Sequence, residues 1–348
     1  MGKIIEANKR DPFLDIIKGI TIFLVVFGHC IQYGSGIEYF SNRSFFYDIT
    51  FKIIYSFHMP LFMLVSGYLF YYNIKKHSIK ELIFNRITRL VVPIFAWNGL
   101  YYITHLLFNT NNVNIFTEII YYLKTSFTAI WFLWALFYCS MVVIIVNKFF
   151  KDNILIYILI FCTTFITPDG LGLEGYKYMY PYFVIAYLYN KNRDVINNKL
   201  LLVKDESKLI AIGFIYIALM FFYDYNSYIY TSLYTIIGKS AITQIGIDLY
   251  RMVIGFVGSI LVLYIVRYLM KKKFITNGVV LSKLGVSSLG IYIISSYINT
   301  LILRITTQFQ MNYAITFLEA SIITLIAYML TKIIKRFKVT NILLLGGR

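Results

Sequence analysis

Charged residues are scarce in this sequence. They make up 14% of the 348 residues, whereas an ordinary soluble domain has roughly 25%. Hydrophobic residues make up 59%, and the mean hydropathy is +0.69. A water-soluble fold cannot bury this much apolar surface, and a disordered chain would be more polar. The composition therefore excludes a soluble enzyme and predicts a polytopic membrane protein.

Cysteine and histidine are scarce as well. Cys30, Cys139 and Cys162 lie inside apolar runs without paired spacing, which excludes a secreted disulfide scaffold and a zinc finger. We interpret these cysteines as small core residues. All 4 histidines lie within residues 1–105, so each one that falls in an apolar run is a candidate functional residue.

Ten apolar runs are long enough, or nearly so, to cross a bilayer as helices, which need about 20 residues each. Backbone groups in lipid must be hydrogen-bonded within their own segment, and these runs are too long and continuous for barrel strands. The predicted spans lie near 14–33, 51–72, 90–108, 128–147, 154–168, 178–190, 209–225, 246–268, 284–303 and 312–333. The connections are short, so the sequence predicts one all-α, membrane-embedded domain over residues 1–348.

Lysine and arginine alternate between the connections of this map. If alternate segments belong to one side, 25 of the 33 Lys and Arg residues fall on the side that holds both termini, and 6 fall on the other. Short cytoplasmic loops are rich in these residues, so both termini are predicted to be cytoplasmic. The net charge of +17 is then a topology signal, with membrane lipid rather than nucleic acid as the expected surroundings.

Ionisable side chains inside the spans are candidate site residues because they are costly in lipid. Asp15 and Lys18 begin the first span and can pair on one helix face; an interfacial ion pair without function fits this spacing equally well. His29 follows Lys18 by eleven residues, on the same face and about 16 Å further along the axis. These two residues cannot touch, but they can line one channel.

His58 lies near the outer end of the second span, at a depth similar to that of His29. Pro60 removes a helical hydrogen bond there and can open space around the imidazole. Either histidine could act as a general base near neutral pH. A hydrogen bond to a neighbouring helix is the alternative for His58. No cluster of acidic ligands accompanies the two histidines, so we expect no metal site.

Arg86 and Arg89 lie three residues apart at the predicted cytoplasmic mouth of the third span. Paired arginines fit phosphate oxygens through two-point contacts, whereas simple anchoring by positive charge is the alternative. On the outer side, Trp131 opens the fourth span, Arg251 lies near the start of the eighth, and Glu319 lies about 10 Å into the tenth.

Several motifs occur in an order that resembles the acyltransferase-3 family of bacterial membrane acyltransferases. They are LDIIKGI at 14–20, VVFGH at 25–29, FHMPLF at 57–62, SGY at 66–68, RITRLVVP at 86–93, WFL at 131–133 and LGVSSLGIY at 284–292. Each motif alone is weakly specific. Their ordered combination covers most of the chain.

This resemblance implies a ten-helix fold and transfer of an acyl group, usually acetyl, from acyl-coenzyme A (acyl-CoA) to a sugar hydroxyl. The family's first-helix basic residue and histidine fall on Lys18 and His29, and its loop arginines fall on Arg86 and Arg89. Most of the family has Arg at the first position; Lys is typical of the polysaccharide O-acetylase and intercellular-adhesin branch. A histidine that often follows the last tyrosine motif is Ser295 here, so a mechanism with a third histidine does not carry over.

The resulting hypothesis is a multi-pass O-acyltransferase of the bacterial cytoplasmic membrane without a permanently bound cofactor. Cytosolic acyl-CoA would dock at Arg86, Arg89 and Lys18, and the acceptor would be a surface polysaccharide or its lipid-linked precursor. His29 would be the base, with His58 as a supporting or alternative base. Glu319 or Asp248 could orient His29, and we predict supporting roles at the acceptor and the oxyanion for Asp15, Trp131, Arg251 and Glu319.

Two alternatives compete with this hypothesis. A glycan exporter would use the same polar layer without chemistry, but the sequence has no inverted repeat and no matched pair of broken helices. A member of the other large family of membrane-bound acyltransferases would carry its histidine late in the chain, and the C-terminal half here has none.

Overall fold

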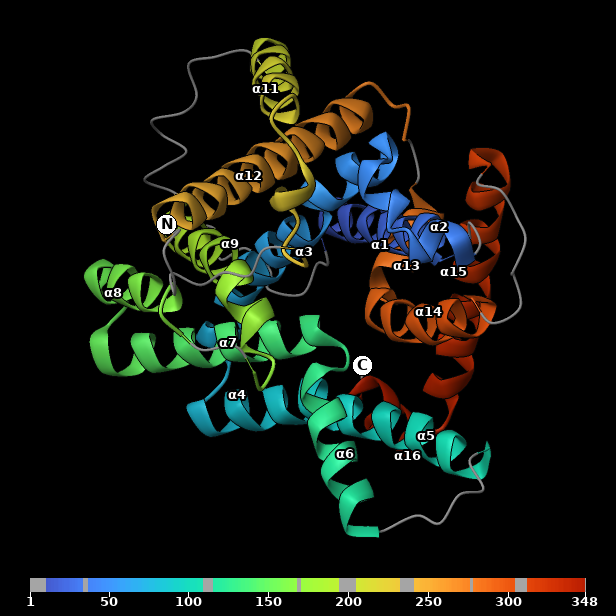
Figure 1. The fold of residues 1–348 in the computed structure, drawn as a ribbon. Coiled ribbons are helices and arrows are strands. Elements are labelled where there is room, and N and C mark those ends of the chain that lie inside the picture. The colour runs from blue at the N-terminus through green and yellow to red at the C-terminus, as the bar shows by residue number, and fades with distance from the viewer. Residues whose placement is uncertain are drawn as a thin grey trace.

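A computed structural model describes residues 11–33, 37–108, 115–167, 170–193, 205–231, 241–275, 278–303 and 312–347, and its regular elements are helices (Figure 1). They are α1 (Pro12–Tyr33), α2 (Ile37–Ser41), η1 (Ser44–Tyr47), α3 (Ile49–Lys76), α4 (Ile79–Arg86), η2 (Ile87–Val91), α5 (Val92–Phe108), α6 (Ile115–Thr128), α7 (Trp131–Phe150), α8 (Ile154–Thr164), α9 (Leu173–Lys191), α11 (Asp205–Met220), η3 (Tyr225–Ser227), α12 (Ala241–Lys271), α13 (Val279–Val286), α14 (Ser288–Leu303), α15 (Tyr313–Arg336) and α16 (Lys338–Leu345).

Polar side chains set the starts of several helices. Asp48 accepts a hydrogen bond from the Phe51 N–H at the start of α3. Ser78 and Glu81 form a reciprocal capping box at α4, and Asn312 caps α15. Such caps satisfy N–H groups that the first helical turn leaves without a carbonyl.

The described helices show a helical membrane protein. Among them, α1, α3, α7, α12 and α15 are long and apolar enough to cross a bilayer, and α13 with α14 would make a sixth span if the bent pair is counted as one. α5, α8 and α11 are shorter, at 17, 11 and 16 residues, and α9 is rich in tyrosine. Each of the ten predicted spans thus contains a helix, although not every one meets the length and hydropathy expected of a full span.

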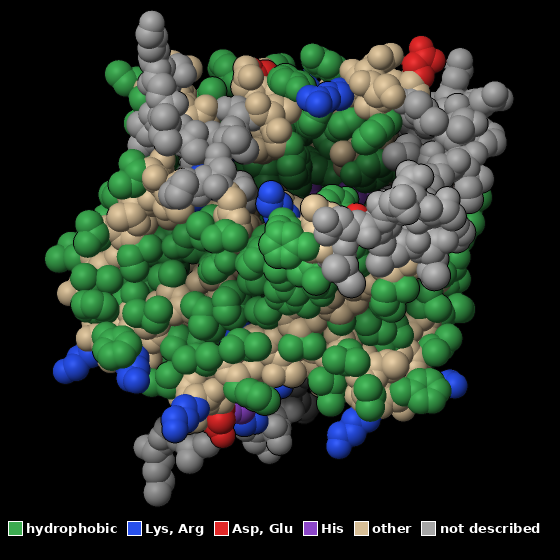
Figure 2. Space-filling model, turned by 60° about the horizontal axis from the view of Figure 1, so that its bottom comes forward, with side chains coloured by type: hydrophobic (Ala, Val, Ile, Leu, Met, Phe, Trp, Pro, Cys, Tyr) green, Lys and Arg blue, Asp and Glu red, His purple; other side chains and the backbone are tan. Residues whose placement is uncertain are grey.

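The surface agrees with this assignment. α15 exposes a row of apolar side chains that includes Ile315, Ile322 and Met329. Figure 2 shows a broad band of hydrophobic side chains across the face in view, with several Lys and Arg side chains along its lower rim. An apolar belt edged by basic residues is the surface expected of a protein embedded in lipid.

Close backbone contacts hold the centre of the bundle together. A Cβ atom at Gly19 would overlap the Leu281 carbonyl, and one at Gly285 would overlap the Asp15 carbonyl, so α1 and α13 pack backbone to backbone. Gly67 brings α3 against α9 in the same way. Small residues at helix crossings allow this approach, which is a main source of helix association in lipid. α1 consequently lies between α3 and the helices α13, α14 and α15 (Figure 1).

The structure differs from the sequence prediction in one span and in several of the connections. The span predicted at 284–303 is not one helix, because α13 and α14 meet at an angle of 78°. Helices α2, α4, α6 and α16 lie in stretches that the sequence predicts to be outside the spans. Residues 1–10 and 348, at the ends of the predicted domain, lie outside the described residues.

Candidate functional site

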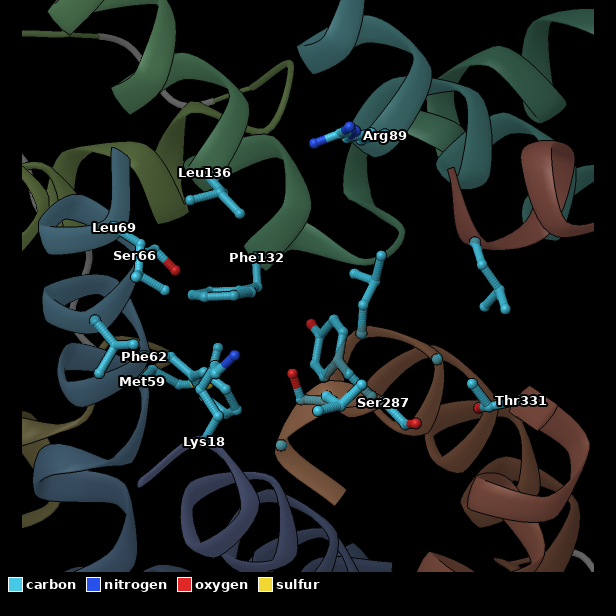
Figure 3. A pocket seen from close by; sticks show the side chains of 18 of the residues that line it. Lys18, Met59, Phe62, Ser66, Leu69, Arg89, Phe132, Leu136, Ser287 and Thr331 are labelled. Atoms are coloured by element: carbon cyan, nitrogen blue, oxygen red, sulfur yellow. The ribbon is translucent and has the colours of Figure 1, made fainter. Parts of the chain in front are cut away.

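A cavity of about 400 Å³ opens between α1, α3, α7, α14, α15 and the turn η2. We call the end of the bundle at which α3 reaches Lys75 and Lys76 the basic end, and the opposite end the distal end. Figure 3 shows Arg89 and Lys18 on opposite sides of the cavity, with Phe132 between the two levels. The predicted donor residues Lys18, Arg86 and Arg89 all line it, although they come from elements far apart in the sequence.

The cavity wall is strongly basic. Lys335 from α15 joins Lys18, Arg86 and Arg89, and no Asp or Glu is among its described lining residues. The Lys18 Nζ lies 2.7 Å from an Asp15 carboxylate oxygen, as the spacing of these two residues predicts. The site therefore favours a polyanionic ligand, because charges in a narrow cleft act through less water than charges on an open surface.

Arg89 lies in an unusual turn, η2, and Arg86 is the residue that precedes it. η2 is a π-helical turn, and such turns are rare and concentrate at functional sites. The guanidinium carbon of Arg86 lies 4.4 Å from the centre of the Phe70 ring, which is a cation–π contact. Gly346, with a φ of 68°, ends α16 directly against the Arg89 backbone, where a Cβ would overlap. The Trp97 indole N–H donates to the Leu344 carbonyl at 2.9 Å and keeps α16 in this position.

The broken helix pair forms the opposite wall. Residues 285–290, from the end of α13 to the first turn of α14, all line the cavity. The pinning of Gly285 against α1 places this break inside the bundle rather than at its surface. The N-terminus of α14 thereby faces the same space as the two arginines.

One face of α3 lines the cavity from the basic end toward the distal end. Asn73, Leu69, Phe62 and Met59 line it, and they span about 21 Å of helix at 1.5 Å per residue. His58 is the residue next to Met59 and lies one turn beyond Phe62, so the cavity stops just short of it. His29 and His58 are therefore not lining residues.

Three aromatic rings cluster at the level of Phe62 in the cavity. The Phe132 ring centroid lies 5.9 Å from that of Phe62 and 5.9 Å from that of Tyr292. All three side chains line the cavity. The cavity includes Lys18 but not His29, so the channel predicted between these two residues stays a prediction.

His58 is buried and held by a hydrogen bond to the backbone. It is 3% exposed, and its Nδ1 lies 2.7 Å from the Ile54 carbonyl oxygen. A carbonyl can only accept, so the neutral ring carries its proton on Nδ1 and leaves a lone pair on Nε2. The Tyr55 ring packs against the imidazole at 4.7 Å between centroids.

His29 is held less tightly. It is half-buried, its ring lies 6.1 Å from that of Tyr33, and its buried Nδ1 has no hydrogen-bond partner in the described part of the chain. The two imidazoles lie close enough to interact electrostatically. The structure therefore brings both predicted bases into one region, with His58 the better oriented of the two.

The two acids expected to orient His29 form no hydrogen bond with its Nδ1 in the described structure. Asp248 pairs with Arg251 at 2.9 Å, and both side chains are fully buried. Glu319 on α15 lies within electrostatic range of Cys30, the residue after His29, but forms no hydrogen bond with His29 in the described structure.

Arg251 and Trp131 lie outside the cavity lining. The Arg251 guanidinium donates to the Asn226 and Tyr228 carbonyls at 2.8 and 2.9 Å, as well as to Asp248. These bonds indicate that it holds the segment around η3 in place. Trp131 lies beside Tyr230, with 6.4 Å between ring centroids. Their predicted roles at the oxyanion remain predictions.

Sequence reasoning missed three parts of this site. Lys335 resembles any basic residue at the end of a span. The only sequence feature that indicates the end of α16 is the pair Gly346 and Gly347. Ser287 lies at the helix break without a proline to mark it. Among the described residues, no group of three or more His, Cys, Asp or Glu could hold a metal ion.

Comparison with known proteins gives one family and two relatives. The model of the acyltransferase domain matches residues 11–336. Nodulation protein NolL of Sinorhizobium fredii is 31% identical over 188 residues, which cover 53% of this chain and 50% of that protein. Nodulation protein NolL of Mesorhizobium japonicum is 30% identical over 190 residues, which cover 53% and 48%. The chain thus aligns with about half the length of these relatives. No solved structure matches.

Proposed function

The chain belongs to the acyltransferase-3 family, and from this premise we propose that it is a membrane O-acyltransferase. It transfers an acyl group, with acetyl as the first choice, from cytosolic acyl-CoA to a hydroxyl of a cell-surface polysaccharide or its lipid-linked precursor. The observation that carries the proposal is the basic cavity, which runs from Arg86 and Arg89 along α3 to the neighbour of His58.

The proposed topology has ten helical spans in the bacterial cytoplasmic membrane, with both termini cytoplasmic. The alternation of Lys and Arg supports this arrangement, as does the helix found in each predicted span. Reporter fusions after residues 80 and 275 should report the cytoplasm, and fusions near residues 45 and 115 the exterior. A reversed reporter in the middle of the chain would overturn the map.

A separation along α1 supports acyl-CoA as the donor. Its phosphates would bind to the basic side chains that line the cavity, Lys18, Arg86, Arg89 and Lys335. Its extended pantetheine arm is as long as about five peptide units, or roughly 17 Å. Lys18 and His29 are about 16 Å apart along α1, so a donor anchored near Lys18 would present its thioester close to the histidines.

The chemistry follows from this placement. A histidine accepts the proton of the acceptor hydroxyl as the hydroxyl oxygen attacks the thioester carbonyl carbon. The tetrahedral intermediate then collapses, the carbon–sulfur bond breaks, and the coenzyme leaves as the thiol once it has received the proton. General base catalysis of this kind contributes about 10²–10⁴ to the rate. We assign the base to His29, with His58, whose Nε2 lone pair is already oriented, as the supporting or alternative base.

The aromatic wall has a part in this mechanism. Phe62, Phe132 and Tyr292 form an aromatic cluster in the cavity wall, one helical turn from His58 at Phe62. In the proposed mechanism, the thioester displaces these rings to reach the base. A closed wall would keep water away from the thioester until the acceptor is present.

Mass spectrometry of the host's surface glycan tests the function. Deletion of the gene should remove the acyl modification while glycan export continues, and restoring the wild-type gene, but not a His29→Ala variant, should return it. Loss of the glycan itself from the surface would instead indicate an exporter.

A further inference from the structure

The break between α13 and α14 is a built feature of the cavity. α13 ends at Val286 and α14 begins at Ser288, and the two axes differ by 78°. The contact of Gly285 with the α1 backbone fixes the end of α13. The first turn of a sixteen-residue helix therefore begins inside the bundle, at the wall of a cavity.

The backbone at this helix start presents N–H groups to the cavity. The first backbone hydrogen bond of α14 is donated by the Ile291 N–H to the Ser287 carbonyl oxygen at 3.0 Å. Ser288, Leu289 and Gly290 precede it and all line the cavity. The first N–H groups of a helix have no intrahelical carbonyl, and together they carry about half a positive charge. Such a terminus attracts anions.

A second observation at the same place points to a ligand. Ser287 is only 6% exposed, lines the cavity, and has no hydrogen-bond partner for its hydroxyl among the described residues. Figure 3 shows its side chain at the start of α14, directed into the cavity. Serine usually caps a helix start by bonding to its N–H groups, yet this hydroxyl forms no such bond. The hydroxyl is therefore available to donate a hydrogen bond to a ligand oxygen in the cavity.

The surrounding charges define the class of that ligand. Arg86, Arg89, Lys18 and Lys335 line the same cavity, no described lining residue is acidic, and Asp15 is paired with Lys18 behind the wall. Phosphate oxygens match backbone N–H groups, a hydroxyl and guanidinium groups at once. We infer that the first turn of α14, with the Ser287 hydroxyl, binds a phosphate group of the donor opposite Arg89. This inference rests on the proposed function, because it takes the donor to be acyl-CoA.

An anionic lipid headgroup offers the same chemistry as the donor phosphate. The full-length protein is therefore studied in nanodiscs of neutral lipid, by calorimetric titration with coenzyme A, pyrophosphate and pantetheine, which lacks phosphate. A parallel arm measures phosphatidylglycerol retention by native mass spectrometry. The variants are Ser287→Ala and Ser287→Asp, with Ser282→Ala and Ser282→Asp as matched controls on α13, outside the cavity lining.

The expected result is graded. Ser287→Ala should weaken binding of coenzyme A and pyrophosphate about tenfold, which corresponds to one hydrogen bond to a charged group. Ser287→Asp should weaken it about a hundredfold, since its carboxylate occupies the anion site. Pantetheine binding should not change. The Ser287→Asp protein should stay folded, with an equal or higher melting temperature, because an acid at a helix start stabilises the helix.

Other outcomes would overturn the inference. If the Ser287 variants bind coenzyme A as the wild type does while Arg89→Ala does not, the α14 site is wrong and the proposed donor stands. If only phosphatidylglycerol retention responds to Ser287→Asp, the site binds lipid rather than donor. If the wild type binds none of the phosphate probes, both the site and the proposed donor are wrong.

Discussion

Replacement of Arg89 by alanine should weaken donor binding strongly while the protein still folds. Arg89 lies in the π-helical turn η2 and lines the cavity opposite the start of α14. A charge-assisted contact to phosphate contributes about 1.5–3 kcal/mol, and each 1.4 kcal/mol is a factor of ten in affinity. The dissociation constant for coenzyme A should therefore rise about 10- to 150-fold. Arg89→Lys should recover only part of this loss, because lysine is a point charge without the planar two-point geometry.

Arg86 should behave differently in one respect. Its guanidinium also lies over the Phe70 ring, and this contact adds about 0.5–1 kcal/mol to the folded state. Arg86→Ala should therefore lower both donor affinity and the melting temperature. Arg89→Ala should lower donor affinity alone.

Calorimetric titration of coenzyme A into nanodiscs measures these effects directly. Lys80→Ala is the matched control, since Lys80 is an exposed residue of α4, the helix that precedes η2, and is not a lining residue of the cavity. If Arg89→Ala bound coenzyme A like the wild type, or Lys80→Ala weakened binding as much, the arginines would be topology anchors and the cavity would not be the donor site.

Three further predictions concern other parts of the molecule. His29→Ala should leave donor binding intact and abolish glycan acylation, whereas His58→Ala should reduce acylation severely but leave some measurable activity. Mass spectrometry of the glycan measures both activities. A variant that acylates at nearly the wild-type rate would exclude the replaced histidine as the base. Gly285→Ala should destabilise the protein by at least about 1–3 kcal/mol, because its Cβ meets the α1 backbone, and thermal unfolding at an unchanged midpoint would contradict this packing. Burial would raise the pKa of Asp152, but its hydrogen bonds, led by that from Lys191, lower it below the ordinary value. The contribution of the ionised Asp152 carboxylate to the free energy of unfolding should thus be complete above the unfolded pKa of about 3.9, and it should be lost as pH falls through the folded pKa. Melting curves recorded at a series of pH values should show this acid-dependent loss of stability in the wild type but not in Asp152→Asn.

Much of the fold could be predicted from hydropathy and charge. Each predicted span contains a helix, and the i, i+3 spacing of Asp15 and Lys18 correctly predicts their ion pair. The break at Ser287 could not be predicted, because apolar content changes little across it and no proline marks it. That break depends on the contact of Gly285 with α1, which is a tertiary interaction.

The same division holds for the site. The phosphate-binding geometry of arginine predicts Arg86 and Arg89 as a pair, and the structure places them with Lys18 in one cavity. Lys335 joins them only through the packing of α15, which no sequence pattern shows. Conversely, the position of Arg251 within a span suggests chemistry, whereas its bonds to the Asn226 and Tyr228 carbonyls indicate that it holds a loop.

A labelling experiment can show whether the protein transfers an acyl group from a cytoplasmic donor to a glycan through its histidines. Inverted membrane vesicles of the host receive radiolabelled acetyl-CoA at their exposed cytoplasmic face, and label is then counted in the glycan fraction. Vesicles with the wild-type protein should label the glycan, and vesicles with His29→Ala should bind the donor without labelling it. Equal labelling in the two, or in vesicles that lack the protein, would contradict the account.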